Sequence, residues 1–223
     1  MLIDESKLGI DGRIDKDSYY LNIAKEVAKR GTCLRRNYGA VIVKNDEIVS
    51  TGYTGAPRGR INCNKIGLCI RMEKQIPSGQ RYELCRSVHA EMNAIISAPR
   101  ERMIGATLYL YGWDVEHNNP KAKPVPCTLC ERMIINAGIE KVITYNPEYT
   151  GDYYAPKTLC YLVKDYITED PALKELGLEM KKPDHIFNHF PQPDHDANDH
   201  DAAAHLFDDI NEVMNDHGLV RED

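Results

Sequence analysis

Helical and extended patterns alternate along most of the chain, and this alternation restricts the possible folds more than any other feature of the sequence. Residues 15–31 carry apolar side chains at helical spacing behind an Asp or Ser cap and end at Gly31, which predicts an amphipathic helix. Residues 38–55 contain two β-branched runs on either side of Asn45 and Asp46, which predicts a hairpin.

Further along, the sequence predicts a helix that begins at His89, a strand over 105–112, a helix over 127–138 that ends at Gly138, and a strand over 140–146. Residues 156–176 are expected to be mostly helical, with a last short strand near Leu178. Helices that alternate with strands favour the α/β class. We therefore expect three α-β-α layers with a central mixed sheet of about five strands, covered on both faces.

The length of 223 residues suits one domain with an appendage. No apolar run reaches the roughly 18 residues of a membrane span, and the first residues lack the pattern of a signal peptide. We therefore expect a cytoplasmic protein with no membrane partner. Seven cysteines, an odd number, favour metal sites or buried thiols over a disulfide framework.

The net charge of −6 is concentrated near the C-terminus, because residues 181–223 hold 3 basic and 11 acidic residues. The rest of the chain is nearly neutral and lacks the strongly basic character that nucleic-acid binding requires, so nucleic acid is not an expected partner. Residues 1–182 are expected to form the folded domain. Residues 183–223 contain six of the eight histidines without a regular ligand spacing, which favours a partly disordered acidic appendage over a metal-binding tract.

Two motifs carry the chemistry of the chain: HAE at residues 89–91 and PCTLC at residues 126–130. The first pattern is expected by chance, but the second is rare at this composition. His89, Cys127 and Cys130 supply the three ligands of a catalytic zinc, which keeps a fourth position for water and lowers the pKa of that water. This pair of motifs is the signature of zinc deaminases.

Glu91 follows His89 by two positions, which lets it reach the same cavity without binding the metal. We expect it to be the catalytic proton carrier, which accepts the proton of the water, protonates the ring nitrogen and helps ammonia to leave. A redox pair of Cys127 and Cys130 is an alternative, but it leaves His89 and Glu91 unexplained. A non-catalytic zinc module that binds partners is a second alternative, and it would have no use for a free carboxylate.

The segments HAEMNAI, PCTLCERMIINAGI and GAVIVKNDEIVSTGYTGAPRG occur in the chain in a specific order. Over roughly residues 16–180 the chain resembles the deoxycytidylate deaminase family, which has the cytidine deaminase fold. This resemblance implies a zinc enzyme that hydrolyses dCMP to dUMP and ammonia. It also implies a homo-oligomer, often a hexamer, and a nucleoside triphosphate effector. A deaminase that acts on another cytosine nucleotide, or on a base in nucleic acid, remains the alternative within the same fold.

The resemblance also implies where the substrate binds. The backbone of Ala90 and Val125 is expected to hold the base, and residues 52–59 are expected to line the sugar and phosphate pocket. Thr54 stands where the family usually has Asn, which leaves the preference between dCMP and CMP open. Arg58, within the motif, is the expected phosphate contact, and further candidates are Arg35, Arg36 and Arg60.

Two other features have alternative interpretations. Residues 112–125 form a longer connection than the family usually has, and loops of this length tend to be functional or disordered; Trp113 either caps the pocket or packs on the surface. The segments around four other cysteines resemble relatives with a second, structural zinc, although buried free thiols are the alternative; these residues are Cys33, Cys63, Cys69 and Cys85. Cys160, at helical spacing with two leucines, is expected in the core.

Overall fold

The computed structural model describes residues 13–120, 124–146 and 157–177. The chain divides into two units, residues 1–183 and 184–223, and every described residue belongs to the first unit. The acidic appendage and the strand expected near Leu178 therefore lie outside the described residues. None of the helices in the described part of the chain has the length and apolar character that a membrane span requires.

A mixed sheet forms the centre of the first unit, in the order β2-β1-β3-β5-β6, with the short β4 paired to β3. The strands are β1 (Arg36–Lys44), β2 (Glu47–Tyr53), β3 (Thr107–Asp114), β4 (Asn119–Pro120), β5 (Lys141–Tyr145) and β6 (Thr158–Leu162). The pairing of β3 with β5 is parallel, whereas every other pairing is antiparallel. The expected mixed sheet of about five strands is confirmed.

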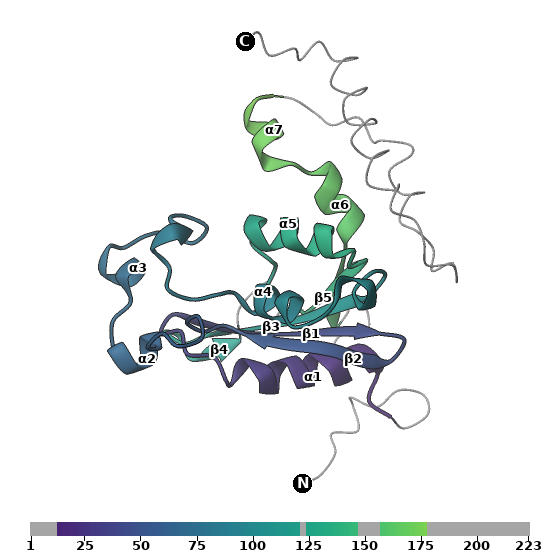
Figure 1. The fold of residues 1–223 in the computed structure, drawn as a ribbon, viewed down its shortest axis with the longest axis horizontal. Helices are drawn as coiled ribbons and strands as arrows, with labels where there is room; N and C mark the ends of the chain where they lie inside the picture. The colour runs from purple at the N-terminus through teal and green to yellow at the C-terminus, as the bar shows by residue number, and fades with distance from the viewer. Residues whose placement is uncertain (1–12, 121–123, 147–156, 178–223) are drawn as a thin grey trace. The chain divides into compact units, whose positions relative to one another are not determined.

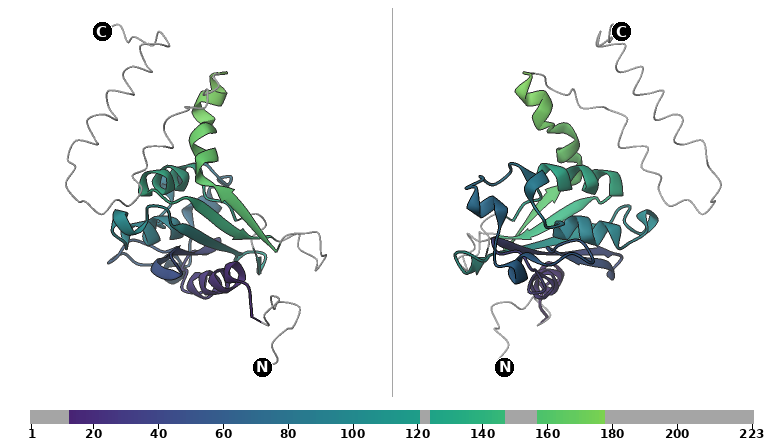
Figure 2. Two further views of the ribbon diagram at one scale, coloured as in Figure 1. Left: turned by 90° about the vertical axis from the view of Figure 1, so that its right-hand side faces the viewer. Right: turned by 60° about the vertical axis from the view of Figure 1, so that its left-hand side comes forward.

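Helices cover both faces of this sheet. Helix α1 (Lys16–Ala28) lies on one face, and α4 (Ala90–Ile96) and α5 (Thr128–Ala137) lie on the other (Figure 1). The two side views show the same three layers (Figure 2). The remaining helical segments are α2 (Cys63–Ile66), α3 (Ile70–Glu73), η2 (Tyr82–Leu84), η3 (Arg100–Arg102), α6 (Val163–Thr168) and α7 (Pro171–Glu175). Of these, α2 and α3 lie beyond one end of the sheet (Figure 1).

Side chains alternate between two apolar clusters because successive residues of a strand point to opposite faces. On the α1 face, Val41 and Tyr109 pack with the helix residues Leu21 and Ala24. On the opposite face the core is aliphatic and contains residues of the sheet and of the covering helices: Ala40, Ile42, Ala90, Ala94, Leu108, Leu110, Ile134 and Val142. The sheet therefore separates an aromatic-rich layer from an aliphatic one.

The residues at the ends of several helices and strands explain why these elements begin or end there. The Asp15 carboxylate accepts a hydrogen bond of 2.8 Å from the backbone N–H of Ser18, which caps α1. Asn45 and Asp46 have positive φ angles of 52° and 63° at the tip of the β1–β2 hairpin. Gly138 ends α5 with a φ of 77°. The predicted helix starting near residue 15, the hairpin and the helix ending at Gly138 are confirmed.

Two glycines allow helices to approach the sheet closely on opposite faces. A Cβ atom on Gly39 would lie 2.1 Å from the Ala24 carbonyl oxygen of α1, and a Cβ atom on Gly52 would lie 2.2 Å from the Ala90 carbonyl oxygen of α4. Neither distance is sterically possible, so any larger residue would push the helix away. Gly52 therefore fixes the position of the N-terminus of α4.

The C-terminal part of the described chain departs from the prediction. Residues 158–162 form the edge strand β6, antiparallel to β5, where a helix was expected, and helices begin only at Val163. Cys160 is exposed on this strand, so its expected place in the core is wrong. A short apolar run does not by itself distinguish a helix from a strand, and here pairing with β5 decides the outcome.

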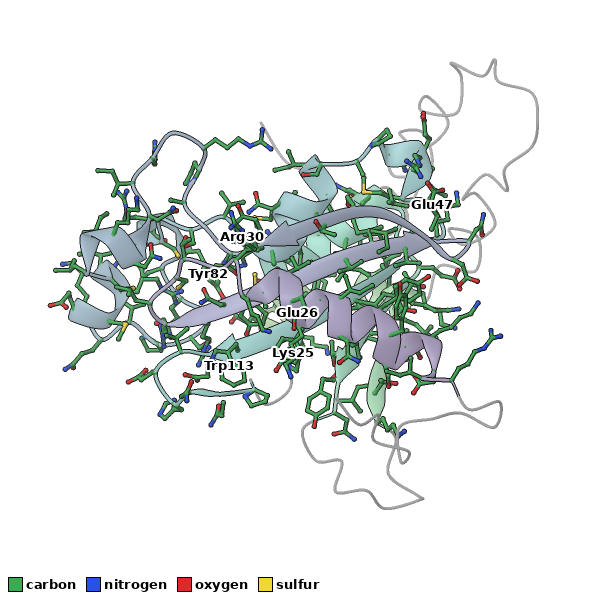
Figure 3. The ribbon with its side chains drawn as sticks, turned by 90° about the horizontal axis from the view of Figure 1, so that it is seen from below. Lys25, Glu26, Arg30, Glu47, Tyr82 and Trp113 are labelled. Atoms are coloured by element: carbon green, nitrogen blue, oxygen red, sulfur yellow. The ribbon has the colours of Figure 1, made fainter. Side chains whose placement is uncertain are left out.

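The long connection after β3 is partly ordered as a hairpin. Strand β3 continues to Asp114 and pairs with β4, and Asn118 has a positive φ of 49° in the turn between them. Trp113 packs against the apolar cluster on the α1 face. Figure 3 shows it at the end of β3, viewed from the α1 side. Of the two interpretations of Trp113, the packing role agrees with this position.

Candidate active site

His89 is held at the start of α4 by its neighbours on both sides. Val88 and Gly55 exchange two backbone hydrogen bonds, of 2.8 Å and 3.3 Å, which join the segment before the helix to the chain after β2. His89 is then the N-cap residue of α4, and Glu91 lies in the first turn of the helix. Together with the close packing at Gly52, these contacts fix the direction of both side chains.

The two cysteines come from the second helix on the same face. Cys127 is the N-cap residue of α5, and Cys130 lies in its first turn. The Nδ1 atom of His89 lies 3.4 Å from the Sγ atom of Cys127 and 3.3 Å from that of Cys130. Since α4 and α5 both begin at this point, the two helices bring together three residues that are separated by β3 in the sequence.

This donor set fits a zinc ion. A tetrahedral zinc with Zn–S of about 2.3 Å and Zn–N of about 2.0 Å places its sulfur and nitrogen ligands about 3.5 Å apart. The observed distances of 3.3 Å and 3.4 Å agree with that value. Within the described ranges, these three residues are the one group of at least three metal-ligating side chains whose donor atoms converge. Three ligands leave one tetrahedral position open, as in catalytic sites.

The two thiols hold their protons differently. The Cys130 thiol donates a hydrogen bond to the Cys127 sulfur, and this bond, together with His89, lowers the pKa of Cys127 to about 3. The same bond and burial raise the pKa of Cys130. Burial opposes protonation of His89, but the hydrogen bond to Cys127 and the Glu91 carboxylate outweigh it and raise the pKa of His89. One thiolate is therefore favoured already, and metal binding must displace the proton of Cys130.

Glu91 is the buried acid of the site. It is 4% exposed, and burial raises the pKa of its carboxyl group above the usual range of glutamic acid. Its carboxylate is not one of the converging donor atoms, but it lies close enough to Cys130 to form a hydrogen bond. A carboxyl group whose pKa is raised in this way can both accept a proton and return it during a reaction.

A cavity of about 450 Å³ opens over these residues, and among its lining residues are His89, Glu91 and Cys127. Of the expected substrate-binding residues, Thr54 and Val125 line the cavity, and the Thr54 hydroxyl oxygen accepts a hydrogen bond of 3.1 Å from the backbone N–H of Tyr38. Ala90 is fully buried behind the lining. The expected arginines divide: Arg35 and Arg36 line the cavity, whereas Arg58 and Arg60 are exposed and are not part of its lining.

The sequence patterns do not indicate several further lining residues, among them Arg71, Tyr82 and Glu131. The Tyr82 ring stands edge-on to His89 with 5.2 Å between the ring centroids, and burial raises the pKa of Tyr82 to about 12. Figure 3 shows Tyr82 towards the end of the unit that holds α2 and α3. Glu131 directly follows Cys130, and this adjacency could have identified it. Nothing in the local sequence of Arg71 or Tyr82 shows that either lies beside the cavity.

The four cysteines proposed for a second zinc lie in the segments that flank α4. Cys63 is buried, and the other three are partly buried: Cys33, Cys69 and Cys85. The Cys33 sulfur accepts hydrogen bonds from the backbone N–H groups of Arg35 and Arg36, at 3.4 Å and 3.5 Å. Burial raises the pKa of Cys33, and Cys85 and Cys69 lie close enough to raise it further. In the described part of the chain these sulfurs do not form a converged metal-ligand group.

A histidine and two cysteines at two helix N-termini, beside a buried carboxyl group, match the donor set of zinc-dependent hydrolytic enzymes. A family model described as the cytidine and deoxycytidylate deaminase zinc-binding region matches residues 14–146. The chain belongs to this family of cytidine and deoxycytidylate deaminases.

Individual proteins show the same similarity. The deoxycytidylate deaminase of Schizosaccharomyces pombe is 35% identical over 143 residues, which cover 64% of this chain and 40% of that protein. The deoxycytidylate deaminase of Mycobacterium phage D29 is 37% identical over 135 residues, which cover 59% of this chain and 94% of that protein. This chain thus spans two fifths of the fission yeast relative and nearly the whole of the phage relative.

Among solved structures, the dCMP deaminase from the cyanophage S-TIM5 in complex with dCMP and dUMP is similar at 23% identity and a TM-score of 0.40. The match covers 74% of this chain and 95% of that chain.

Proposed function

We propose that this chain is a zinc-dependent deaminase that hydrolyses dCMP to dUMP and ammonia. The observation that carries the proposal is the burial of Glu91, at 4% exposure, beside the converging donor atoms of His89, Cys127 and Cys130. Family membership and relatives that are named deoxycytidylate deaminases support the same reaction.

The roles of the residues follow from their positions. A bound zinc would supply Lewis acidity and lower the pKa of a water molecule at its open position. Glu91 accepts the proton of that water and delivers it to N3 of the cytosine ring; it then accepts the proton of the hydroxyl group added at C4, as the C4 carbonyl forms and the C4–N bond breaks, and passes it to the departing 4-amino group. Burial favours its protonated form, which matches the two steps in which it delivers a proton.

The substrate-binding residues are proposed on the same basis. The backbone of Ala90 and Val125 lies at the first turn of α4 and just before Cys127, where a base presented to the metal ligands would lie. Since the Thr54 oxygen already accepts a hydrogen bond from Tyr38, its hydroxyl proton is the group that remains to donate to a sugar oxygen. Thr54 therefore supports sugar recognition but does not by itself select deoxyribose over ribose.

Two alternative functions would require different features of the chain. An enzyme that deaminates a base in RNA or DNA would need a basic binding surface, and residues 1–180 are nearly neutral. A non-catalytic zinc module would need four protein ligands that occupy every coordination position. It would not need a buried ionisable carboxyl group beside a set of three ligands. Both observations favour the nucleotide deaminase.

The test is ammonia release by the zinc-loaded full chain from a panel of substrates: dCMP, CMP, deoxycytidine, cytidine and adenosine-containing RNA. We expect dCMP to be the best substrate and CMP to be a poorer one. Activity on adenine in RNA with none on cytosine nucleotides would replace this proposal with the nucleic-acid alternative, and no ammonia from any substrate would favour the zinc module.

A second, structural zinc bound by the four other cysteines is a separate proposal. The closeness of Cys33, Cys69 and Cys85 and the two N–H groups directed at Cys33 support it. Metal analysis of the fully loaded chain should give two zinc ions, and Cys85→Ser should lose one of them. Cys160→Ser, on the exposed edge strand, is the matched control and should keep both. One zinc per wild-type chain would contradict the proposal.

Assembly and regulation are proposed from the resemblance alone. We infer a homo-oligomer, with a hexamer as the specific expectation, and a nucleoside triphosphate effector in the cytoplasm. Light scattering of the purified chain tests the assembly, and a change in dCMP turnover on addition of each nucleoside triphosphate tests the effector. A monomer, or turnover that no triphosphate changes, would contradict the respective inference.

A further inference from the structure

Arg71 is a buried cation that faces the cavity. It lies in α3, is 8% exposed and lines the cavity. One of its terminal nitrogens donates a hydrogen bond of 2.9 Å to the Pro77 carbonyl oxygen, and its guanidinium carbon lies 4.8 Å from the centre of the Tyr82 ring. Its Nε atom is buried and has no hydrogen-bond partner, and none of the ion pairs among the described residues includes Arg71.

This arrangement is energetically unfavourable on its own. Removing a charged group from water is costly unless an opposite charge and hydrogen bonds replace the water. The carbonyl of Pro77 and the face of Tyr82 satisfy part of the guanidinium, but neither provides a full negative charge. Arg71 therefore presents an unneutralised charge and an unused N–H group next to an open cavity.

Arg36 shares the unused N–H group with Arg71, although its charge is paired with a nearby carboxylate. It lines the cavity, and one terminal nitrogen donates a hydrogen bond of 2.8 Å to the Ser78 hydroxyl. Its Nε atom is also buried without a hydrogen-bond partner, and the carboxylate oxygen of Asp114 lies 3.9 Å away, too far for a hydrogen bond. The two arginines thus reach adjacent residues of one loop, because Arg71 contacts Pro77 and Arg36 contacts Ser78.

The Arg71 guanidinium lies no further from the His89 ring than the length of one nucleotide. The His89 ring is 5.2 Å from the Tyr82 ring, and the Tyr82 ring is 4.8 Å from the Arg71 guanidinium carbon. The guanidinium is therefore within about 10 Å of the imidazole, a span comparable to the base, sugar and phosphate of a pyrimidine nucleotide. The other charged lining residues are Arg35, which donates a hydrogen bond of 3.1 Å to the Ile76 carbonyl oxygen, and the acidic Glu91 and Glu131.

We propose that Arg71 and Arg36 together bind the 5′-phosphate of the nucleotide substrate and so determine that the enzyme acts on a nucleotide and not on a nucleoside. This inference rests on the proposed deaminase function. Each guanidinium offers its free Nε–H, and a planar guanidinium suits phosphate oxygens better than a point charge does. The exposed Arg58, which the motif suggested, lies outside the cavity lining.

The test compares two substrates that differ only in the phosphate. For the zinc-loaded full chain, kcat/KM is measured on dCMP and on deoxycytidine for the wild type, Arg71→Met and Arg36→Met. Each substitution should lower kcat/KM on dCMP by about ten- to a hundredfold, because it removes charge-assisted hydrogen bonds to the phosphate. The kcat/KM on deoxycytidine should stay nearly unchanged, because this substrate has no phosphate to bind. Arg71→Lys should recover part of the loss, because it keeps the charge without the planar donors.

The matched control is Arg86→Met. Arg86 also has a buried Nε atom without a hydrogen-bond partner, and it donates to the Ile61 carbonyl oxygen at 3.0 Å, but it does not line the cavity. This variant should keep the wild-type ratio of dCMP to deoxycytidine turnover. An equal loss on both substrates in Arg71→Met and Arg36→Met would show a purely structural role and overturn the proposal.

A binding measurement separates this inference from the deaminase proposal. Inorganic phosphate should bind the wild type and Arg86→Met in calorimetry, and bind Arg71→Met and Arg36→Met at least tenfold more weakly. If the wild type releases no ammonia from any cytosine compound yet shows this phosphate pattern, the deaminase function fails and the anion site stands. If all variants bind phosphate equally, the anion site is overturned whatever the activity.

Discussion

The two faces of the sheet differ in whether their buried polar groups have hydrogen-bond partners. On the α1 face, two buried tyrosine hydroxyls have partners: the Tyr20 hydroxyl donates to the Asp46 carbonyl oxygen at 3.0 Å, and the Tyr109 hydroxyl donates to the Asp17 carboxylate at 2.9 Å. On the opposite face, Glu91 is buried with a raised pKa, and the hydroxyl of the fully buried Thr144 has no hydrogen-bond partner. The face that carries the site therefore contains buried groups whose burial is unfavourable, as is common at functional sites.

The largest effect is expected when the proposed proton carrier, Glu91, is replaced. Glu91→Gln should fold and retain zinc, because the carboxylate is not among the metal donors. Turnover of dCMP should fall by about a hundred- to ten-thousandfold, since general acid–base catalysis contributes factors of that size. Steady-state kinetics with metal analysis of the same sample test this, and activity within tenfold of the wild type would exclude Glu91 from the reaction.

The second prediction compares the two glycines at which helices approach the sheet. Gly39→Ala and Gly52→Ala should each lower the free energy of unfolding by about 1 to 3 kcal/mol, because the new methyl group meets helix backbone. Only Gly52→Ala should also lower zinc occupancy and turnover per folded molecule, since it displaces α4 and with it His89 and Glu91. Urea unfolding and zinc content of both variants test this; equal losses of zinc would show that the faces are not independent.

The third prediction concerns a partnered group on the α1 face. Tyr109→Phe should lower the free energy of unfolding at neutral pH by about 1 to 2 kcal/mol, because the hydrogen bond to Asp17 is lost. Burial, and then this hydrogen bond, raise the pKa of Tyr109. A raised pKa means that its contribution is complete below pH 10, the usual value for tyrosine, and declines as the pH rises above it. The difference between wild type and variant should therefore shrink above pH 10, and a constant difference would contradict the assignment.

The smallest effect is expected when an unpartnered hydroxyl is removed from the face covered by α4 and α5. Thr144 lies two residues after Val142 on β5, so both side chains point to the face of α4 and α5. Thr144→Val should raise the free energy of unfolding by up to about 1 kcal/mol, because no hydrogen bond is lost with the hydroxyl. Calorimetry should show a melting temperature higher by about 2 to 4 °C, with unchanged turnover. A lower melting temperature would indicate that the hydroxyl has a partner such as a buried water.

Local signals in the sequence are sufficient for much of the fold. The first helix, the β1–β2 hairpin and the helix that ends at Gly138 follow from caps, turn residues and periodicity, which act over a few positions. Strand β6 does not, because Thr158–Leu162 reads equally well as either structure until β5 supplies its hydrogen bonds. The exposure of Cys160 has the same origin, since it depends on which face of that edge strand the side chain occupies.

The residues of the site also fall into those that the sequence predicts and those that it does not. His89, Glu91, Cys127 and Cys130 follow from motifs, because metal ligation imposes fixed spacings within each segment. Arg71 and Tyr82 do not, because their relation to the cavity arises from the packing of a connection that has no regular pattern. Arg58 shows the opposite case: it lies within a motif, yet the structure places it in solvent and outside the cavity lining.

The separation of the metal donors along the sequence also affects when the site can form during folding. The β1–β2 hairpin turns at Asn45 and Asp46, whereas His89 lies 38 residues from Cys127 and 41 from Cys130. Loop closure costs about 0.6 kcal/mol more for each doubling of length, and the contacts that repay it here require β3 to join the sheet first. The hairpin can therefore form from its own residues alone, whereas the donor atoms can converge only after β3 has joined the sheet, so we expect metal affinity to depend on completion of the sheet.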